Sequence, residues 1–291
     1  MFERDLITLD FEGSQVRMLL VHGGQVARWE SLTAPAEQMS QGVVHEPAAV
    51  GQALRQMLER SEVRRGRVAA SVTGMRAISR MVSLPPVREK HLEDTLRHKI
   101  RQEIPLPLDD MDLTWHVVAR SAEGSEVYVL AVPRDAVDRL VETLAAAGLK
   151  PATLDVRPLA LARLIVPESA VLLTMEEHSL SVLILRHGTP VVVRTVPFGI
   201  SRSAVEAQLE LANQELARTI KFYNEGHRDD TIGTGSPVFA TGESVEPLEV
   251  VEALARRHGG PVEVPPTPLP APNDLPKATY AVNLGLALKK I

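Results

Sequence analysis

Few residues of this sequence stand at spacings that support catalysis or metal binding. The run Glu176, Glu177 and His178 offers metal ligands or an acid/base pair, but adjacent residues in a tight turn project in different directions. A solvated turn explains this run at lower cost, and Asp10 is explained as a strand-end carboxylate that accepts turn hydrogen bonds. No H-E-x-x-H, G-x-S-x-G, Walker or dinucleotide-binding signature occurs. The sequence therefore contains no independent catalytic motif.

The composition bounds the class of protein. A chain of 291 residues that is 44% hydrophobic and 24% charged can bury a large core, which predicts a globular protein of two lobes. The net charge of -5 argues against nucleic acid as a partner. The chain has no cysteine, and its acidic start and short apolar runs match neither a signal peptide nor a membrane-spanning helix. We expect a cytoplasmic protein without direct membrane insertion, whose membrane association is peripheral and indirect.

Apolar periodicity predicts how the first part of the chain is built. Strands are expected near 5–10, 15–21 and 25–31, followed by a helix near 47–60 and a strand at 67–72. An α+β insert over 74–150 then contains the remaining elements of this half. Its strands are predicted near 77–83, 112–119 and 126–132, and its helices near 88–103 and through Val137, Leu140, Val141 and Leu144.

An internal repeat relates the two halves of the chain. A shift of 165 residues aligns the segment from Leu6 with the segment from Val171 and matches Ser14 with Ser179, His22 with His187 and Gly23 with Gly188. Each half therefore opens with a three-stranded meander. In the second half we predict helices near 201–223, around Leu248 to Leu254 and near 277–290, a strand near 237–241, and a Pro-rich stretch at 261–276.

Duplicated lobes of this plan are found in the actin superfamily, and three segments resemble the PilM family in particular. They are Val72–Val118, with its strand ending in Leu-Pro and its I-P-x-P-L turn, Arg194–Gly199 and Ala281–Lys290. The resemblance implies an α/β fold with two actin-like, ribonuclease H-like lobes, an insert in the first lobe and a reduced second lobe. The first lobe is expected at 1–73 and 151–168, the insert at 74–150, and the second lobe at 169–291, with the final helix packing back on the first.

The resemblance also implies a cofactor site, because the family holds ATP and magnesium between the lobes. The positions implied for the nucleotide are Asp10, Gly13, Ser14, Ser179 and Gly242. This sequence departs from the family pattern at each contact point, with Glu12 in place of glycine, Met175 opposite Asp10 in the 165-residue register, and Glu243 directly after a single glycine. Carboxylates beside a polyphosphate cost Coulomb energy. We therefore expect weak or absent ATP binding and negligible hydrolysis.

A partner is implied in the same way. PilM relatives bind the cytoplasmic N-terminal tail of the single-pass membrane protein PilN, and the apolar loops around Pro85 and Pro105 of this sequence are expected to help form such a groove. The expected groove residues are Met75, Ile78, Val82, Leu84, Ile104 and Leu106.

Taken with the degraded nucleotide motifs, this resemblance predicts a scaffold subunit of a type IV pilus, or of a related secretion or competence machine. Its partners would be a PilN-like protein and other platform proteins at the inner membrane. Two alternatives remain. An active actin-like ATPase or kinase would need intact phosphate hairpins, and a GspL-like component of a type II secretion platform normally continues into a membrane helix, whereas this sequence ends in LALKKI.

Overall fold

The computed structural model describes residues 5–63, 66–72, 77–103, 108–198, 204–233 and 235–290. The chain divides into two compact units, a larger one formed by Met1–Thr73 with Arg139–Ile291 and a smaller one formed by Gly74–Asp138. The smaller unit ends before the predicted boundary at 150. Helix α3 (Arg134–Ala146) continues past Asp138 into the larger unit, where Gly51 of α1 (Pro47–Arg60) packs closely against it.

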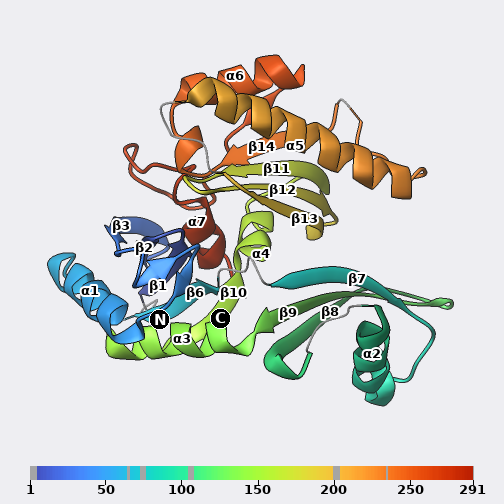
Figure 1. Cartoon of the computed structure of the whole chain (residues 1–291), viewed down its shortest axis with the longest axis horizontal. Helices are drawn as coiled ribbons and strands as arrows, with labels where there is room; N and C mark the ends of the chain where they lie inside the picture. Colours follow the sequence, from blue (N-terminus) through green and yellow to red (C-terminus); the bar gives the residue numbers. More distant parts are fainter. Residues whose placement is uncertain are drawn as a thin grey trace. The chain divides into compact units, whose positions relative to one another are not determined.

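The larger unit contains two five-stranded sheets with the same strand order (Figure 1). The first sheet runs β10 (Pro151–Val156), β6 (Arg67–Val72), β1 (Leu6–Glu12), β2 (Gln15–His22) and β3 (Gln25–Thr33). The second runs β15 (Val262–Glu263), β14 (Val238–Thr241), β11 (Ser169–Met175), β12 (Ser179–Arg186) and β13 (Thr189–Pro197). In each sheet the central strand pairs antiparallel with one neighbour and parallel with the other. The two predicted meanders are thereby confirmed.

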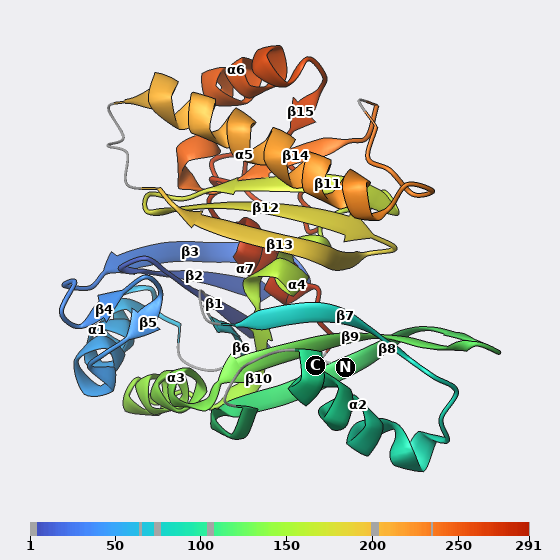
Figure 2. The ribbon, with the colours of Figure 1, turned by 45° about the vertical axis from the view of Figure 1, so that its right-hand side comes forward.

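Helices fill the space between the sheets and cover their outer faces. Helices α4 (Arg157–Ala162) and α7 (Ala281–Ala287) lie between the sheets, and their apolar side chains share one core with residues of β2, β11 and β12 (Figure 2). Helices α5 (Val205–Gly226) and α6 (Leu248–His258) pack on the other side of the second sheet. A two-stranded hairpin, β4 (Met39–Ser40) with β5 (Val43–Val44), precedes α1, and a short 3-10 helix, η2 (Glu243–Val245), follows β14.

Strand pairing corrects the register of the repeat by one residue. In the first sheet the hairpin turns are closed by Glu12 with Gln15 and by His22 with Gln25, and the corresponding pairs of the second sheet are Glu176 with Ser179 and Arg186 with Thr189. The two lobes are therefore related by a shift of 164 residues, not 165. Both third strands also carry a bulge at the same place, between Val26 and Arg28 and between Pro190 and Val192.

The corrected register changes which residues are equivalent, since a slip of one residue moves every side chain to the opposite face of a strand. Asp10 corresponds to Thr174, not to Met175, and Glu12 corresponds to Glu176. The contacts of these side chains agree with the corrected register. Ser71 of β6 donates a hydrogen bond to Asp10, and in the second lobe Thr241 of β14, the strand equivalent to β6, shares a hydrogen bond with Thr174.

The smaller unit is a three-stranded sheet covered by one helix. Its strands run β7 (Ile78–Leu84), β9 (Gly124–Pro133) and β8 (Met111–Ser121), and the short 3-10 helix η1 (Leu108–Asp110) precedes β8. The apolar stripe of α2 (Glu89–Glu103), which includes Leu92, Leu96 and Ile100, packs against this sheet as its periodicity predicts. Among the described residues, no helix of the chain is long and apolar enough to cross a bilayer.

Candidate functional site

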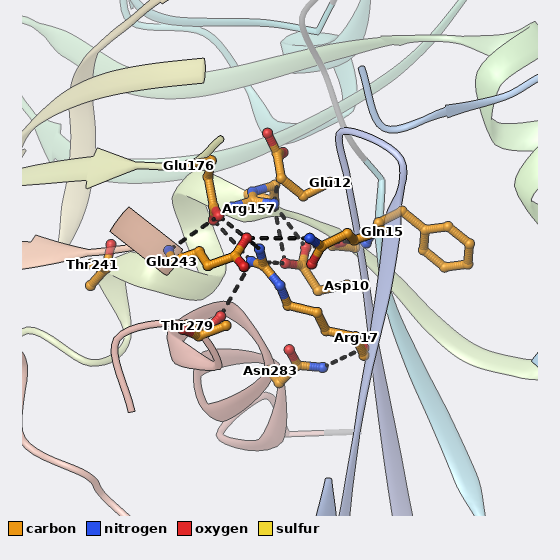
Figure 3. A network of polar contacts seen from close by, with 12 residues as sticks. Asp10, Glu12, Gln15, Arg17, Arg157, Glu176, Thr241, Glu243, Thr279 and Asn283 are labelled. Carbon is orange, nitrogen blue, oxygen red and sulfur yellow. Dashed lines mark hydrogen bonds and ion pairs between the residues drawn. The ribbon is translucent and has the colours of Figure 1, made fainter. Parts of the chain in front are cut away.

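Five charged side chains meet where the central strands of the two sheets end (Figure 3). Asp10 and Glu12 come from the end of β1, and Arg17 comes from β2 opposite Asp10. Glu176 directly follows β11, and Arg157 is the first residue of α4. The first hairpins of the two lobes meet here, since Arg17 of the first bonds to Glu176 of the second and Ser179 of the second bonds to Glu12 of the first. We call the five charged residues the charged cluster.

Arg157 joins the two equivalent glutamates. Its Nη1 lies 2.7 Å from Oε2 of Glu12, and its Nη2 donates to Oε1 of Glu176 over 2.6 Å. The same Nη1 donates to both carboxylate oxygens of Asp10, over 3.3 and 3.1 Å. One guanidinium therefore contacts carboxylates of both lobes.

Arg17 provides the second link. It donates from Nη1 and Nη2 to the two carboxylate oxygens of Glu176, over 3.1 and 2.9 Å, which is the bidentate geometry that arginine makes best. Nη1 also donates to the carbonyl oxygen of Thr279, and Nη2 lies 3.5 Å from Glu243. The backbone of Arg17 is fixed as well, since Asn283 of α7 donates to its carbonyl oxygen. The Arg17 side chain is only 2% exposed.

Hydrogen bonds from neutral donors to carboxylates extend the cluster to the rim of the cleft between the lobes. Ser179 of β12 donates to Glu12 over 2.8 Å, and Gln15 of β2 donates to Glu243 over 3.3 Å. Each of these bonds joins a residue of one lobe to a residue of the other.

The equivalent glutamates titrate differently. Burial raises the pKa of Glu176, but its contacts with Arg17 and Arg157 outweigh burial and lower that pKa to about 2. Burial also raises the pKa of Glu12, and there the attraction of Arg157 is too weak to reverse the effect, because Glu176 and Asp10 repel an additional negative charge. Burial lowers the pKa of Arg17 and Arg157, but the surrounding carboxylates leave both pKa values raised.

The space left beside the charged cluster is small. A pocket of about 210 Å³ is lined by Glu12, Gly13, Ser14, Gln15, Arg17, Glu176, Glu177, His178 and Glu243. The described residues also contain no group of three side chains placed to hold a metal ion.

The comparisons with known proteins agree with this architecture. The family model described as type IV pilus assembly protein PilM matches residues 9–199, which is more than half of the chain. The chain belongs to the PilM family. A structure of a PilM–PilN type IV pilus biogenesis complex superposes with a TM-score of 0.81 at 22% identity and covers 97% of both chains.

Two more distant structures share the fold with this PilM-family chain. The ethanolamine utilization protein EutJ of Carboxydothermus hydrogenoformans has a TM-score of 0.59 at 15% identity, covering 99% of this chain and 90% of that one. The cytoplasmic domain of EpsL, an inner membrane component of the type II secretion system of Vibrio cholerae, has a TM-score of 0.56 at 13% identity, covering 99% and 96%. The predicted actin-like α/β fold is confirmed.

The cleft of this PilM-family member does not fit the ATP and magnesium that the resemblance implied. A polyphosphate with its metal needs free backbone N–H groups and carboxylates available to the ion and its waters. Here the carboxylates of Asp10 and Glu176 are bound to arginine instead. The lobes are also close together, since a methyl group on Gly13 would lie 3.7 Å from the ring of His178.

Several residues predicted for the nucleotide have a different surrounding. Gly13 and Ser14 line the small pocket, and Ser179 bonds to Glu12 across the cleft. Gly242 has φ +99°, and a methyl group there would lie 2.4 Å from the carbonyl oxygen of Met175, so close backbone packing explains this glycine. The sequence prediction missed Arg157. The one available signal was Pro158, because proline favours the first turn of a helix and so indicates that α4 begins at Arg157.

The predicted groove residues divide into two groups. Met75, Ile104 and Leu106 lie outside the described residues. Leu84 was predicted in an exposed loop, and this is wrong: it is the last residue of β7 and 3% exposed, and Val82 is 1% exposed. Both belong to the core beneath α2, because they alternate onto the covered face of the sheet. Ile78 is half-buried at the start of the same strand.

Proposed function

We propose that this protein is a cytoplasmic scaffold subunit of a type IV pilus assembly platform, bound at the inner membrane through the N-terminal tail of a PilN-like membrane protein. The observation that carries the proposal is the family match over residues 9–199. A structure with a similar fold, at a TM-score of 0.81, is a complex of PilM with PilN, which supports a partner of this kind.

The scaffold works without ATP hydrolysis in this proposal. A phosphoryl-transfer enzyme needs groups free to position a metal, the phosphates and an attacking water. The carboxylates of Asp10 and Glu176 are instead bound to Arg157 and Arg17, and both arginines are anchored on two or more acceptors. A cleft in this arrangement supports a structural role for the two lobes.

The partner tail docks, we propose, along β7 in the smaller unit. This strand pairs only with β9 among the described strands, so its other edge offers backbone groups to an extended peptide. Ile78 and Met81 are half-buried and project to opposite faces of the strand, where they can contact alternate side chains of a bound peptide. Val82 and Leu84 support this strand from beneath, through the core that they share with α2.

The first test is a calorimetric titration with a peptide that copies the N-terminal cytoplasmic tail of a PilN-like protein from the same organism. Saturable one-to-one binding without nucleotide is the expected result. Binding that requires Mg-ATP would refute nucleotide independence, and the absence of binding under both conditions would refute the proposed partner.

The docking position needs variants that spare the core, so Val82 and Leu84 are unsuitable. Met81→Glu places a charge at the half-buried position on the edge strand and is expected to weaken peptide binding at least tenfold, about 1.4 kcal/mol. Val205→Glu is the matched control, because it places the same charge at a 43%-exposed apolar position of α5. Equal affinities for the two folded variants would exclude β7 as the docking strand.

A further inference from the structure

The contacts of the charged cluster cross the cleft between the lobes in both directions. Arg17 and Gln15 of the first lobe reach Glu176 and Glu243 of the second. In the other direction, Ser179 of the second lobe reaches Glu12 of the first. The two lobes are thus joined at the place where relatives with this fold are expected to hold a nucleotide.

Glu176 is the central acceptor of the cluster. Three of its hydrogen bonds come from guanidinium groups, two from Arg17 and one from Arg157, and its side chain is 3% exposed. Without this carboxylate Arg157 would keep its contacts with Asp10 and Glu12, but Arg17 would keep only longer ones, 3.9 Å to Asp10 and 3.5 Å to Glu243, in a space with little water. Like charges in such a place repel strongly, and each arginine would gain by becoming hydrated.

The ionised Glu176 carboxylate therefore favours closure of the lobes, in addition to the apolar core that they share around α4 and α7. Opening the cleft of the wild-type protein separates Glu176 from Arg17 and breaks the bonds at the rim. Opening the cleft of a variant without the carboxylate breaks fewer bonds and lets water reach both guanidinium groups, which screens their repulsion. The balance between closed and open forms should respond to this one side chain.

We propose that Arg17, Arg157 and Glu176 form an ionic latch that holds the two lobes closed in the absence of nucleotide. The guanidinium groups supply the positive charge that a metal ion would bring to such a cleft, and the Glu176 carboxylate supplies the negative charge between them. The latch needs no partner protein, so its test is independent of the proposed role in pilus assembly.

The absence of cysteine makes the test direct. Gln52 on α1 and Glu249 on α6 are exposed and lie in the first and second lobe, respectively, so both can be replaced by cysteine and spin-labelled. Pulsed electron resonance then measures the distribution of distances between the labels. We expect one narrow distribution for the parent protein and an added population at longer distances for Glu176→Gln.

Glu215→Gln is the matched control. Glu215 is also a buried carboxylate between two arginines, Arg194 at 2.7 Å and Arg218 at 2.9 Å, but all three belong to the second lobe. Its loss should lower stability without changing the distance between the lobes. A general loosening of the fold would instead broaden the distribution in both variants, and that result would overturn the latch.

A second variant covers the case in which Glu176→Gln does not fold. The double change Arg17→Met with Glu176→Gln removes the bidentate pair without leaving Arg17 unpaired, and such exchanges of buried ion pairs are often tolerated. Longer distances are again expected, since only weaker bonds then cross the cleft. A folded variant, single or double, whose distance distribution equals that of the parent protein would overturn the proposal.

Discussion

Glu12 and Glu176 occupy equivalent positions in the two lobes, yet their surroundings shift the pKa values of the two carboxyl groups in opposite directions. Glu176 is bound by both arginines, whereas Glu12 is in contact only with Arg157 among them and accepts a hydrogen bond from the neutral hydroxyl of Ser179. Two guanidinium groups cannot neutralise all the carboxylates around them. The carboxylate with fewer positive contacts is therefore the one that burial makes harder to ionise.

The lowered pKa of Glu176 predicts an acid-sensitive contribution to stability. A carboxyl group with a folded-state pKa near 2 stabilises the fold above its ordinary value of 4.5, and this contribution is lost as the pH falls from 4.5 toward 2. Glu176→Gln should therefore cost about 3–5 kcal/mol at pH 7, as expected for a broken buried ion pair, and less at pH 3. Denaturant unfolding at both pH values measures this difference. A cost that does not change with pH would contradict the assignment.

The raised pKa of Glu12 predicts that ionisation of this group lowers the stability of the fold, which is the opposite of the effect of Glu176. A carboxyl group that binds its proton more tightly in the folded state destabilises the fold at a pH above its folded-state pKa, and this cost disappears as the pH falls below 4.5. Glu12→Gln, which imitates the protonated form and keeps an acceptor for Ser179, should raise the melting temperature at pH 8. The gain should vanish near pH 4. A lower melting temperature at pH 8 would show that the ion pair with Arg157 outweighs the burial cost.

At the scale of elements, the site depends on how closely α4 and α7 cross. Gly285 of α7 packs directly on α4, and a methyl group at this position would lie 1.9 Å from the carbonyl oxygen of Ala160. The first residue of α4 is Arg157, and Asn283 of α7 bonds to the backbone of Arg17. The spacing of these two helices therefore sets the position of both arginines of the latch.

Gly285→Ala should separate the two helices and destabilise the protein by about 1–3 kcal/mol, because the clash is with backbone that cannot rotate away. Gly226→Ala is the control at the end of α5, where no atom lies within 4 Å of the added methyl group. Urea unfolding of both variants gives the comparison. Equal free energies of unfolding would mean that the contact between α4 and α7 adjusts at no cost.

Most elements could be predicted from the sequence, and the exceptions share a physical cause. The longer helices and the meanders were found because their apolar periods extend over several turns or residues. Helix α4 has six residues, less than two turns, and strand β10 begins at a proline and contains Asp155, so neither shows the apolar pattern that predicted β6, and only packing against the rest of the protein defines them. The register was missed by one residue because His187, with φ +51°, takes the left-handed turn position that Gly23 fills in the first lobe.

The same limit applies to the site. Sequence spacing placed Asp10, Gly13 and Ser14 at one hairpin, because they are neighbours along the chain. It could not place Arg157, which is separated from Asp10 by 147 positions in the sequence and reaches it only through the packing of α4. The sequence showed acidic residues at positions where the family has glycine. It did not show that Arg17 and Arg157 bind the carboxylates of this site.

The whole molecule, with its lobes closed by its own side chains, should respond to nucleotide differently from an actin-like ATPase. A ligand that binds only the folded state adds about 2.7 kcal/mol of stability at a concentration 100 times its dissociation constant. Closed by the latch, the cleft offers a pocket of about 210 Å³ and no free carboxylate of Asp10 or Glu176. Millimolar Mg-ATP should therefore leave the melting temperature of the wild-type protein unchanged, while the PilN-like peptide, as the positive control, should raise it. A saturable rise with Mg-ATP, absent with magnesium alone, would mean that the lobes open readily and that nucleotide competes with the arginines for the cleft.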